Sequence, residues 1–301
     1  MELHARGIDV TWRVEPESEL ALRATCGELV SRRSRASYDL LVANDFRSLW
    51  QAIALDGLRK VAFVGHGAWQ FSPIRARIIR LVRATTFVVS KSVAIDAVSK
   101  GLTGDVPILP LGPGVWSSRP ENSLEFLDPE NLRNLTLGSV ARLDPIKRLP
   151  MFARVTASLG VRAALVVPRP ASEAEQELLD YLLTFSHIDL RVGGDVSRLW
   201  TDIDVFLSTS EAESLGLAHL EALQSGVPVV STAANGPEDF LIHELNGGWI
   251  PQANEETAVS EVKEALTSLW LSRATYWDQA EEVLRSRNIA RCADLILSGV
   301  K

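Results

Sequence analysis

Cysteine is nearly absent from this sequence, since Cys26 and Cys292 are the two among 301 residues. Because they lie near opposite ends of the chain, they give neither a disulfide framework nor the ligand spacing of a metal site. Long hydrophobic runs are absent too, because no stretch reaches the roughly 18 apolar residues that a transmembrane helix requires. Residues 1–7 carry charge where a signal peptide needs an apolar run. We therefore expect a reducing, cytoplasmic setting, with peripheral contact to a membrane at most.

An excess of positive charge is also missing, because the formal net charge is −7. This balance argues against nucleic acid as a general partner, since nucleic-acid binding depends on basic side chains. The charge is unevenly distributed along the chain. Residues 1–118 hold 15 Lys and Arg against 11 Asp and Glu, a net charge of +4. Residues 119–301 hold the remaining 16 Lys and Arg against 27 Asp and Glu, a net charge of −11. The two parts of the chain are expected to face different partners.

The length and the hydrophobic pattern predict two domains. A chain of 301 residues with 46% hydrophobic content can bury a core in each of about two domains. Continuous apolar strands separated by helices are typical of parallel sheets covered on both faces, so the predicted class is α/β, doubly wound. Short apolar runs of this kind recur between helical patterns at 40–43, 61–64, 86–89, 135–137, 164–167, 204–207 and 228–231.

Proline and glycine accumulate between Leu109 and Asn131, where regular periodicity disappears. We interpret this break as a linker and place the first domain at residues 1–118 and the second at residues 119–274. Residues 275–301 have a helical pattern without a further strand, so we expect this segment to pack on existing surface.

The densest signal is the segment 204–231, in which a buried strand leads into a short loop and a helix. The loop lies at the carboxyl end of a parallel strand, where folds of this class bind ligands. Ser214 is placed to cap the helix. The amides of Gly216 and Leu217 lie at the partly positive helix end, which suits a phosphate group.

Glu213 and Glu221 stand eight residues apart, the first in this loop and the second in the helix. Ionised carboxylates only accept hydrogen bonds, so two of them near an anionic ligand are best explained by hydroxyl groups, such as those of a ribose and a sugar. The plainer alternative is that Glu213 caps the helix and Glu221 is a solvated surface charge.

The stretch from Glu213 to Glu221 (ESLGLAHLE), followed by GVPVV at 226–230, resembles the E-x7-E motif of retaining glycosyltransferases of the GT-B fold, family 4. The resemblance implies two Rossmann-like domains that face each other across a cleft. It also implies that Glu213 contacts the transferred sugar and Glu221 the ribose, with Ser214, Leu215, Gly216 and Leu217 at the nucleotide-sugar donor.

A second segment, residues 137–148 (LGSVARLDPIKR), is similar to the G-R-L-x-x-x-K-G pattern of the same family. Arg142 and Lys147 keep the family spacing, whereas Ala141 and Arg148 replace its two glycines. A guanidinium and an ammonium at one strand end can bind a diphosphate and stabilise its charge in place of a metal ion. An ordinary surface Arg and Lys beside a helix start is the alternative.

Weaker features follow the same comparison. Gly236 and Glu238 resemble a glycine-rich turn that borders the donor pocket, and His66 follows a strand where the family often has a histidine near the reacting centre. Asp45 follows another strand and could reach the same cleft. A plain turn, a structural histidine and a helix cap are the respective alternatives. The stretch 168–170 (PRP) departs from the family's Gly-x-Gly turn, on the nucleobase side.

Two further segments have competing interpretations. Residues 74–83 project an arc of isoleucine, leucine and valine beside a broad basic arc, which suits an anionic membrane or a phosphate-bearing acceptor; a solvated outer face is the alternative. Asp202 and Asp204 spell the D-x-D of metal-dependent glycosyltransferases, but Asp204 opens a predicted buried strand, so we expect a structural role.

Residues 3–11 resemble the end of the first helix in the family's N-terminal domain, so we expect the preceding strand and glycine-rich loop to be missing. The expected function is retaining transfer of a sugar from a nucleoside-diphosphate sugar to an acceptor hydroxyl, without a metal cofactor. The acceptor stays open between a glycan, a lipid-linked and a small molecule. A nucleotide-sugar epimerase or hydrolase on the same fold, and a donor-binding but inactive partner subunit of another glycosyltransferase, are the alternatives.

Overall fold

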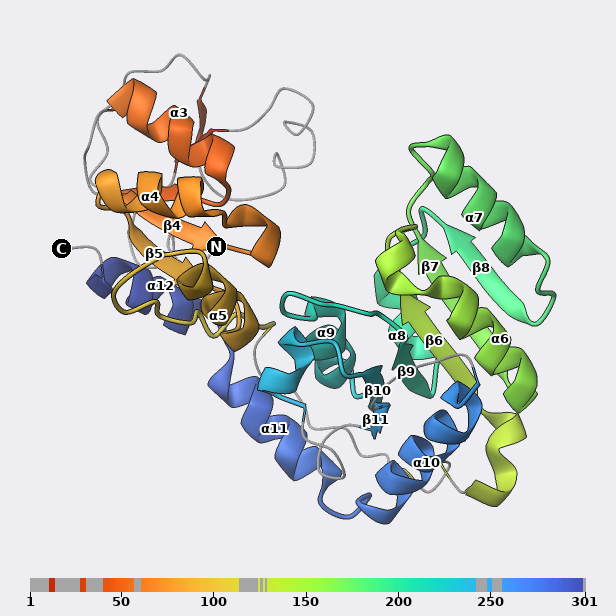
Figure 1. The fold of residues 1–301 in the computed structure, drawn as a ribbon. Helices are drawn as coiled ribbons and strands as arrows, with labels where there is room; N and C mark the ends of the chain where they lie inside the picture. Colours follow the sequence, from red (N-terminus) through yellow and green to blue (C-terminus); the bar gives the residue numbers. More distant parts are fainter. Residues whose placement is uncertain are drawn as a thin grey trace. The chain divides into compact units, whose positions relative to one another are not determined.

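The computed structural model describes residues 11–13, 28–30, 40–56, 61–113, 124, 127, 129–241, 248–250 and 256–299. Contacts between Cα atoms divide the chain into two compact units, drawn in Figure 1. The first unit holds residues 1–111 and 288–301, and the second holds residues 112–287. The predicted boundary at residue 118 and the predicted shortened start at residues 3–10 lie outside the described residues.

The second unit contains a six-stranded parallel sheet in the order β11-β10-β9-β6-β7-β8. The chain runs outward from β6 through β7 to β8 and then returns to β9 on the other side of β6. This change of direction makes the carboxyl ends of β6 and β9 a topological switch point, where open α/β sheets bind ligands. The strand bounds are β6 Thr136–Val140, β7 Arg162–Val167, β8 Ile188–Val192, β9 Val205–Ser208, β10 Val229–Thr232 and β11 Gly248–Ile250.

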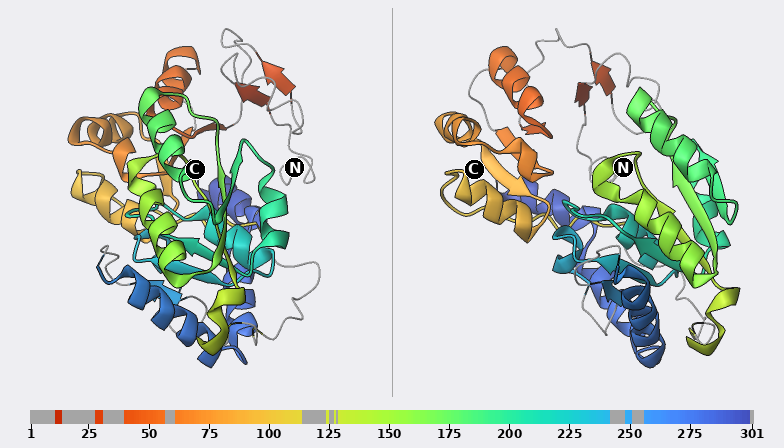
Figure 2. Two further views of the ribbon diagram at one scale, coloured as in Figure 1. Left: turned by 90° about the vertical axis from the view of Figure 1, so that its right-hand side faces the viewer. Right: turned by 45° about the vertical axis from the view of Figure 1, so that its right-hand side comes forward.

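Helices cover both faces of this sheet, as right-handed crossovers in opposite directions require (Figures 1 and 2). On one face α6 contacts α7 and α10, and on the other α8 contacts β6 and β7 while α9 contacts α11. The helix bounds are α6 Leu149–Leu159, α7 Glu173–Leu183, α8 Val196–Asp202, α9 Leu217–Gln224, α10 Ala258–Leu271 and α11 Tyr276–Ser286. Short 3-10 turns lie at Pro129–Asn134, Pro145–Lys147 (η5) and Gly236–Asp239 (η6).

The central strands are apolar because side chains on both of their faces are buried. All four residues of β9 are buried, and Phe206 is only 2% exposed. Gly138 in β6 is required by packing, since a Cβ atom there would lie 2.4 Å from Cδ1 of Ile203. The edge strand β8 differs, because Asp189 is exposed and pairs with Arg191 at 2.6 Å.

The first unit contains a three-stranded parallel sheet, β3-β4-β5, and a separate parallel pair, β1-β2. Strand β4 is buried along its whole length, and the hydroxyls of Ser72 and Ser90 cap the helices that follow β4 and β5. The elements are β1 Thr11–Arg13, β2 Glu28–Val30, β3 Leu41–Ala43, α3 Phe46–Asp56, β4 Val61–Gly65, η2 Ala68–Gln70, α4 Pro73–Leu81, β5 Thr85–Val88 and α5 Lys91–Ser99.

The C-terminal segment holds two helices that belong to different units. Helix α11 lies in the second unit, whereas α12, Ile289–Gly299, belongs to the first. Gly299 packs so closely on β5 that a Cβ atom there would lie 2.9 Å from Cζ of Phe87. The segment that the sequence presents as one helical stretch is therefore divided between two cores.

The first and last residues of the second unit lie against each other. A Cβ atom at Gly112 would come within 2.7 Å of the carbonyl oxygen of Arg287 and 2.8 Å of its Cβ atom. Glycine is needed at residue 112 because the two backbone segments approach this closely.

Candidate active site

The loops that follow β6 and β9 are tied together at the switch point. The hydroxyl of Thr209 donates to the carbonyl oxygens of Lys147 and Arg148, at 3.0 and 3.2 Å. The amide of Glu211 donates to the carbonyl oxygen of Ile146 at 2.8 Å, and its carboxylate lies 3.0 Å from the guanidinium of Arg148. The structure therefore brings two segments predicted separately from the sequence to one place.

Lys147 and Glu213 meet between these loops. The ammonium of Lys147 lies 2.5 Å from Oε1 of Glu213, and the hydroxyl of Ser210 donates to the same oxygen at 2.8 Å. Both charged side chains are largely buried, with exposures of 12% and 19%. Burial would raise the pKa of Glu213, but positive charge at His219 and Lys147 and the hydrogen bonds from Lys147 and Ser210 outweigh it, so the pKa is lowered.

His219 lies beneath this pair, on the buried side of α9. Its Nε2 is 2.9 Å from the hydroxyl of Ser231, and its ring packs edge-on against Phe206. Complete burial lowers the pKa of His219 to about 4, so the imidazole is neutral near pH 7. At neutral pH, Lys147 is therefore the source of the positive charge that faces Glu213.

Helix α9 begins at Leu217, and Gly216 precedes it in the left-handed conformation, with a φ of 85°. The prediction that Ser214 caps this helix is wrong, because the cap position belongs to Gly216 and no side chain fills it. Leu215 is buried and Leu217 is 53% exposed. The positive φ explains the glycine, since a residue with a Cβ atom would be strained there.

Gly236 lies directly against this loop. Its amide donates to the carbonyl oxygen of Glu213 at 2.9 Å, and a Cβ atom at residue 236 would lie 2.5 Å from the carbonyl carbon of Ser214. The carboxylate of Glu238 accepts from the amide of Asn235 at 3.0 Å, at the start of η6. In this structure Gly236 and Glu238 thus shape the turn that borders the Glu213 loop.

Glu221 lies on α9, half-buried. Burial raises the pKa of its carboxyl group, and no hydrogen bond or ion pair to this group is found within the described residues. A desolvated carboxylate without a donor is unfavourable unless a ligand supplies one.

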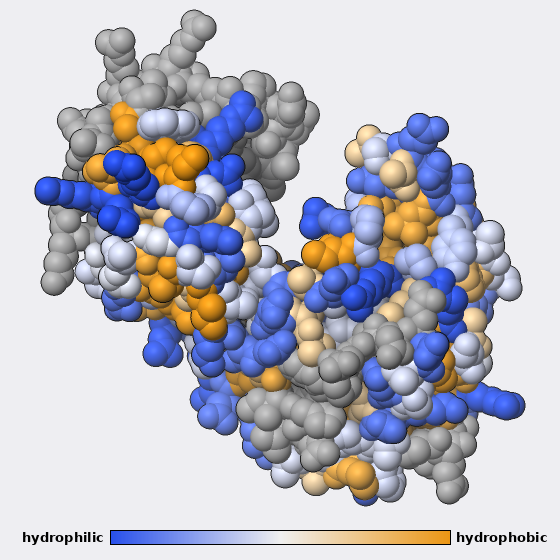
Figure 3. Space-filling model, viewed as in Figure 1, coloured by the Kyte–Doolittle hydropathy of each residue, from blue (hydrophilic) through white to orange (hydrophobic). Residues whose placement is uncertain are grey.

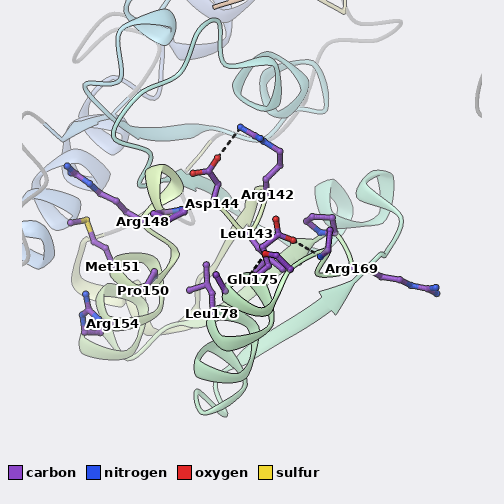
Figure 4. A pocket seen from close by; sticks show the side chains of 15 residues that line it. Arg142, Leu143, Asp144, Arg148, Pro150, Met151, Arg154, Arg169, Glu175 and Leu178 are labelled. Atoms are coloured by element: carbon purple, nitrogen blue, oxygen red, sulfur yellow. Dashed lines mark hydrogen bonds and ion pairs between the residues drawn. The ribbon is translucent and has the colours of Figure 1, made fainter. Parts of the chain in front are cut away.

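An open hollow of about 1130 Å³ lies beside the Lys147 loop, at the carboxyl ends of β6 and β7 (Figure 4). Leu143, Met151 and Leu178 contribute apolar side chains to its lining. Arg142, predicted to bind the donor, also lines the hollow. Its side chain extends away from α6 and α7, and its guanidinium lies 3.4 Å from the carboxylate of Asp144. Its side chain is 73% exposed.

The segment that departs from the family pattern also lines this hollow. Pro168 and Arg169 follow β7 directly. Arg169 packs against Gly193, where an added Cβ atom would lie 3.5 Å from Cγ of Arg169. Gly193 has a positive φ of 66°. The hollow therefore has a stiff proline-flanked edge on this side.

His66 and Asp45 lie in the first unit, at the carboxyl ends of β4 and β3. His66 Nε2 is 3.5 Å from the side-chain oxygen of Asn44, and partial burial lowers the pKa of His66 despite the opposing charge of Asp45. Asp45 caps α3, because its carboxylate accepts from the amide and the hydroxyl of Ser48 at 2.6 and 2.8 Å. That carboxylate oxygen is therefore engaged in helix capping.

The D-x-D sequence has structural contacts. Asp202 pairs with Arg191 at 2.8 Å, and Asp204 accepts from the amide of Thr136 at 2.7 Å. Across the described ranges, no cluster of three or more His, Cys, Asp or Glu side chains is arranged to hold a metal ion. None of the helices in those ranges is long and apolar enough to cross a bilayer.

Thr209, Ser210 and His219 were not found by sequence reasoning. Thr209 and Ser210 form a buried polar pair directly after a buried apolar strand. A polar pair at the end of such a strand is the sequence signal that could have identified them. His219 lies on the face of α9 that carries Leu220 and Leu223, so its burial follows from the helical period.

Comparison with known proteins finds similarity in the part of the chain that carries this site. Residues 135–282 match the family model described as glycosyl transferases group 1. Sulfoquinovosyl transferase SQD2 of Arabidopsis thaliana is 28% identical over 190 residues, which cover 60% of this chain and 37% of that protein. A GDP-mannose-dependent alpha-mannosyltransferase of Mycobacterium tuberculosis is 29% identical over 115 residues, covering 38% of this chain and 30% of that protein. The chain thus spans about a third of the length of these curated relatives.

Solved structures resemble nearly the whole chain. HepE of Anabaena, solved in complex with UDP-glucose, has a TM-score of 0.76 and 16% identity, covering 99% of this chain and 92% of that one. A glycosyltransferase from Rickettsia africae also has a TM-score of 0.76, with 13% identity and 99% and 91% coverage. The predicted fold class, α/β of the GT-B type with two Rossmann-like units, is confirmed.

Proposed function

Given a glycosyl transferases group 1 domain at residues 135–282, we propose that this chain transfers a sugar from a nucleoside-diphosphate sugar to an acceptor hydroxyl. We further propose retention of configuration and no requirement for a metal ion. One observation carries the proposal: the buried contact of 2.5 Å between Lys147 and Glu213 at the switch point of the sheet, beside the start of α9.

The donor diphosphate is proposed to bind Lys147, Arg142 and the amides of Gly216 and Leu217. An ammonium, a guanidinium and a partly positive helix end are groups that stabilise the charge on a departing diphosphate, and this supports a mechanism in which they act in place of a metal ion. Phosphate oxygens would compete with Glu213 for the ammonium of Lys147. Donor binding would thereby release the ammonium from Oε1 of Glu213, which keeps the hydrogen bond from Ser210.

Glu213 is proposed to orient the transferred sugar and Glu221 to bind the ribose. The lowered pKa of Glu213 keeps it ionised at neutral pH, so it accepts hydrogen bonds from sugar hydroxyls. Glu221 has a raised pKa from burial, and two ribose hydroxyls would supply the donors it lacks within the described residues. Ser214 and Leu215 are proposed to contribute backbone groups of the same loop.

In the proposed reaction the bond between the anomeric carbon and the donor phosphate oxygen breaks, and its electron pair stays on that oxygen. The acceptor oxygen attacks the anomeric carbon on the same face, and its proton passes to the departing phosphate oxygen. Positive charge that develops on the sugar ring in such a transition state is stabilised by the Glu213 carboxylate. His66, a neutral imidazole of the first unit, is proposed to hydrogen-bond the sugar.

The test incubates the full chain with radiolabelled UDP-, GDP-, ADP- and dTDP-sugars and a panel of glycan, lipid-linked and small-molecule acceptors. We expect one donor class to raise the melting temperature, as a ligand at a hundredfold excess over its Kd stabilises by about 2.7 kcal/mol. We also expect a retained anomeric product by NMR, with turnover unaffected by EDTA.

Lys147→Ala and Glu213→Ala should abolish transfer, whereas Glu281→Ala, which breaks an exposed pair with Arg285, should not. Near-normal turnover in either the Lys147 or the Glu213 variant would contradict the role proposed for that residue. Release of free sugar or of an epimer without an acceptor would instead indicate the hydrolase or epimerase. Donor binding without turnover, rescued by a second chain, would indicate a partner subunit.

A further inference from the structure

Three large apolar side chains are exposed on consecutive elements of the first unit. Trp69 in η2 is 70% exposed, and Ile74 and Leu81 in α4 are 74% and 68% exposed. Single exposed apolar residues are ordinary, but a contiguous group marks a surface that binds something. Trp69 is held next to α4, because its carbonyl oxygen accepts from the guanidinium of Arg75 at 2.9 Å.

Helix α4 places two of these residues on the same side as an arginine. Ile74, Arg77 and Leu81 are spaced by three and four residues, so they share one face of the helix. The other face carries Ala76 and Ile79, which are buried. The predicted single apolar arc is therefore divided: one part enters the core and the other remains on the surface.

The stretch of sequence that contains these residues carries charge of one sign. From Val61 to Ile95 the sequence holds no Asp or Glu, but it holds four arginines and one lysine. Arg75 and Arg80 are engaged within the unit, with the carbonyl oxygens of Trp69 and Gly101. Figure 3 shows apolar and hydrophilic side chains next to one another over α4.

Arg77 and Arg83 are exposed, and neither has an ion pair or hydrogen-bonded side chain within the described residues. Arg83 also adopts the left-handed conformation after α4, with a φ of 54°. Glycine suits this backbone conformation better, so Arg83 adopts it at a conformational cost. Both guanidinium groups are available to an external anion.

We propose that Trp69, Ile74, Arg77, Leu81 and Arg83, here named the α4 surface, dock on a bilayer that contains anionic lipid. Apolar and aromatic side chains enter the headgroup region of a bilayer while neighbouring arginines bind lipid phosphates. A purely anionic polymer would not require three exposed apolar residues. A purely apolar protein partner would not favour a segment with five cations and no acid.

This surface lies in a different unit from Lys147 and Glu213, and the proposal does not depend on the proposed activity. The test sediments the full chain with vesicles of phosphatidylcholine alone and with vesicles that contain 30% phosphatidylglycerol. We expect binding to the anionic vesicles, weakened by high salt. The double variant Arg77→Gln/Arg83→Gly should weaken it about tenfold or more, because each arginine near an anionic surface contributes on the order of 1 kcal/mol.

Ile74→Ser/Leu81→Ser should also weaken binding, because the apolar part of the contact is removed. The matched control is Arg162→Gln/Arg198→Gln, which removes two exposed arginines of the second unit and should bind like wild type. The Arg77→Gln/Arg83→Gly variant should keep the wild-type melting temperature, so its weaker binding cannot be attributed to unfolding.

Wild-type protein that fails to sediment with anionic vesicles overturns the proposal. Unchanged binding of the Arg77/Arg83 variant also overturns it, because the arginines then do not contact the lipid. Unchanged binding of the Ile74/Leu81 variant overturns it as well, because the contact is then electrostatic adsorption alone. Tight binding of duplex DNA, lost in the same arginine variant, with no vesicle binding would assign the surface to nucleic acid instead.

Discussion

The hydroxyl of Thr209 donates to the carbonyl oxygen of Lys147, 62 residues earlier in the chain. This contact joins the end of β9 to the loop after β6, so the positions of Lys147 and Glu213 relative to one another depend on it. Thr209 is only 3% exposed and makes a second bond to the carbonyl oxygen of Arg148.

Thr209→Val keeps the shape of the side chain but removes both hydrogen bonds. We expect a loss of about 1–3 kcal/mol in the free energy of unfolding, because the carbonyl oxygen of Lys147 loses this donor, whereas that of Arg148 keeps the amides of Met151 and Phe152. Affinity for the preferred nucleoside diphosphate should fall as well, since Lys147 is no longer held. Urea denaturation and isothermal titration measure the two effects. Thr209→Ser, which keeps the hydroxyl, should restore most of the affinity; equal losses in both variants would contradict a positioning role.

The Lys147–Glu213 pair makes stability depend on pH. The folded-state pKa of Glu213 is lowered below 4.5, so its contribution to stability is present above pH 4.5 and is lost as the pH falls through the lowered value. Glu213→Gln should therefore reduce the free energy of unfolding by about 1–3 kcal/mol at pH 7. Near pH 3 the difference from wild type should shrink. A difference that stays constant from pH 7 to pH 3 would show that the ion pair is not its source.

His219 contributes in a higher pH range. Its pKa falls from 6.5 to about 4 on folding, so the unfolded chain gains a proton between these values while the folded chain does not. Stability should therefore decrease as the pH falls from 6.5 to 4, by at most about 1.4 kcal/mol per pH unit. His219→Gln keeps a donor for Ser231 but cannot titrate, so urea denaturation should show a shallower dependence. An unchanged slope would exclude His219 as the titrating group.

Glu221 is expected to lower stability in the absence of ligand. Because burial raises its pKa, ionisation of Glu221 is less favourable in the folded than in the unfolded chain. Glu221→Gln should stabilise the ligand-free protein at pH 7 by roughly 0.5 kcal/mol at most, since a half-exposed carboxylate is screened by solvent. The same variant should bind the nucleoside diphosphate more weakly. If thermal shift shows a rise in affinity, Glu221 does not contact the ribose.

The buried strands were predictable because their side chains are apolar on both faces. The runs at 164–167 and 204–207 correspond closely to β7 and β9. Strand β8 was missed because Asp189 and Arg191 interrupt its apolar pattern, and it lies at the edge of the sheet, where such residues are tolerated. A run of apolar residues identifies a strand whose two faces are buried more readily than a strand that pairs at the edge of a sheet.

The site was predictable as far as parallel strands determine it. Carboxyl ends of neighbouring strands meet at one edge of a sheet, so the loops bearing Lys147 and Glu213 could be expected there together. The contacts of Thr209 and Ser210 could not, because they join segments far apart in the sequence. The start of α9 was misplaced because the left-handed turn at Gly216, rather than the hydroxyl of Ser214, determines where the helix begins.

The second unit is one continuous piece of chain, and the contact between Gly112 and Arg287 brings its two ends together. Such a piece is arranged like a domain inserted into a host, with one entry and one exit at the same place. Joining residue 287 to residue 112 through a short linker and opening the chain in a surface loop would yield a circular permutant. We therefore expect the unit that carries Lys147 and Glu213 to fold as a single module when it is produced alone.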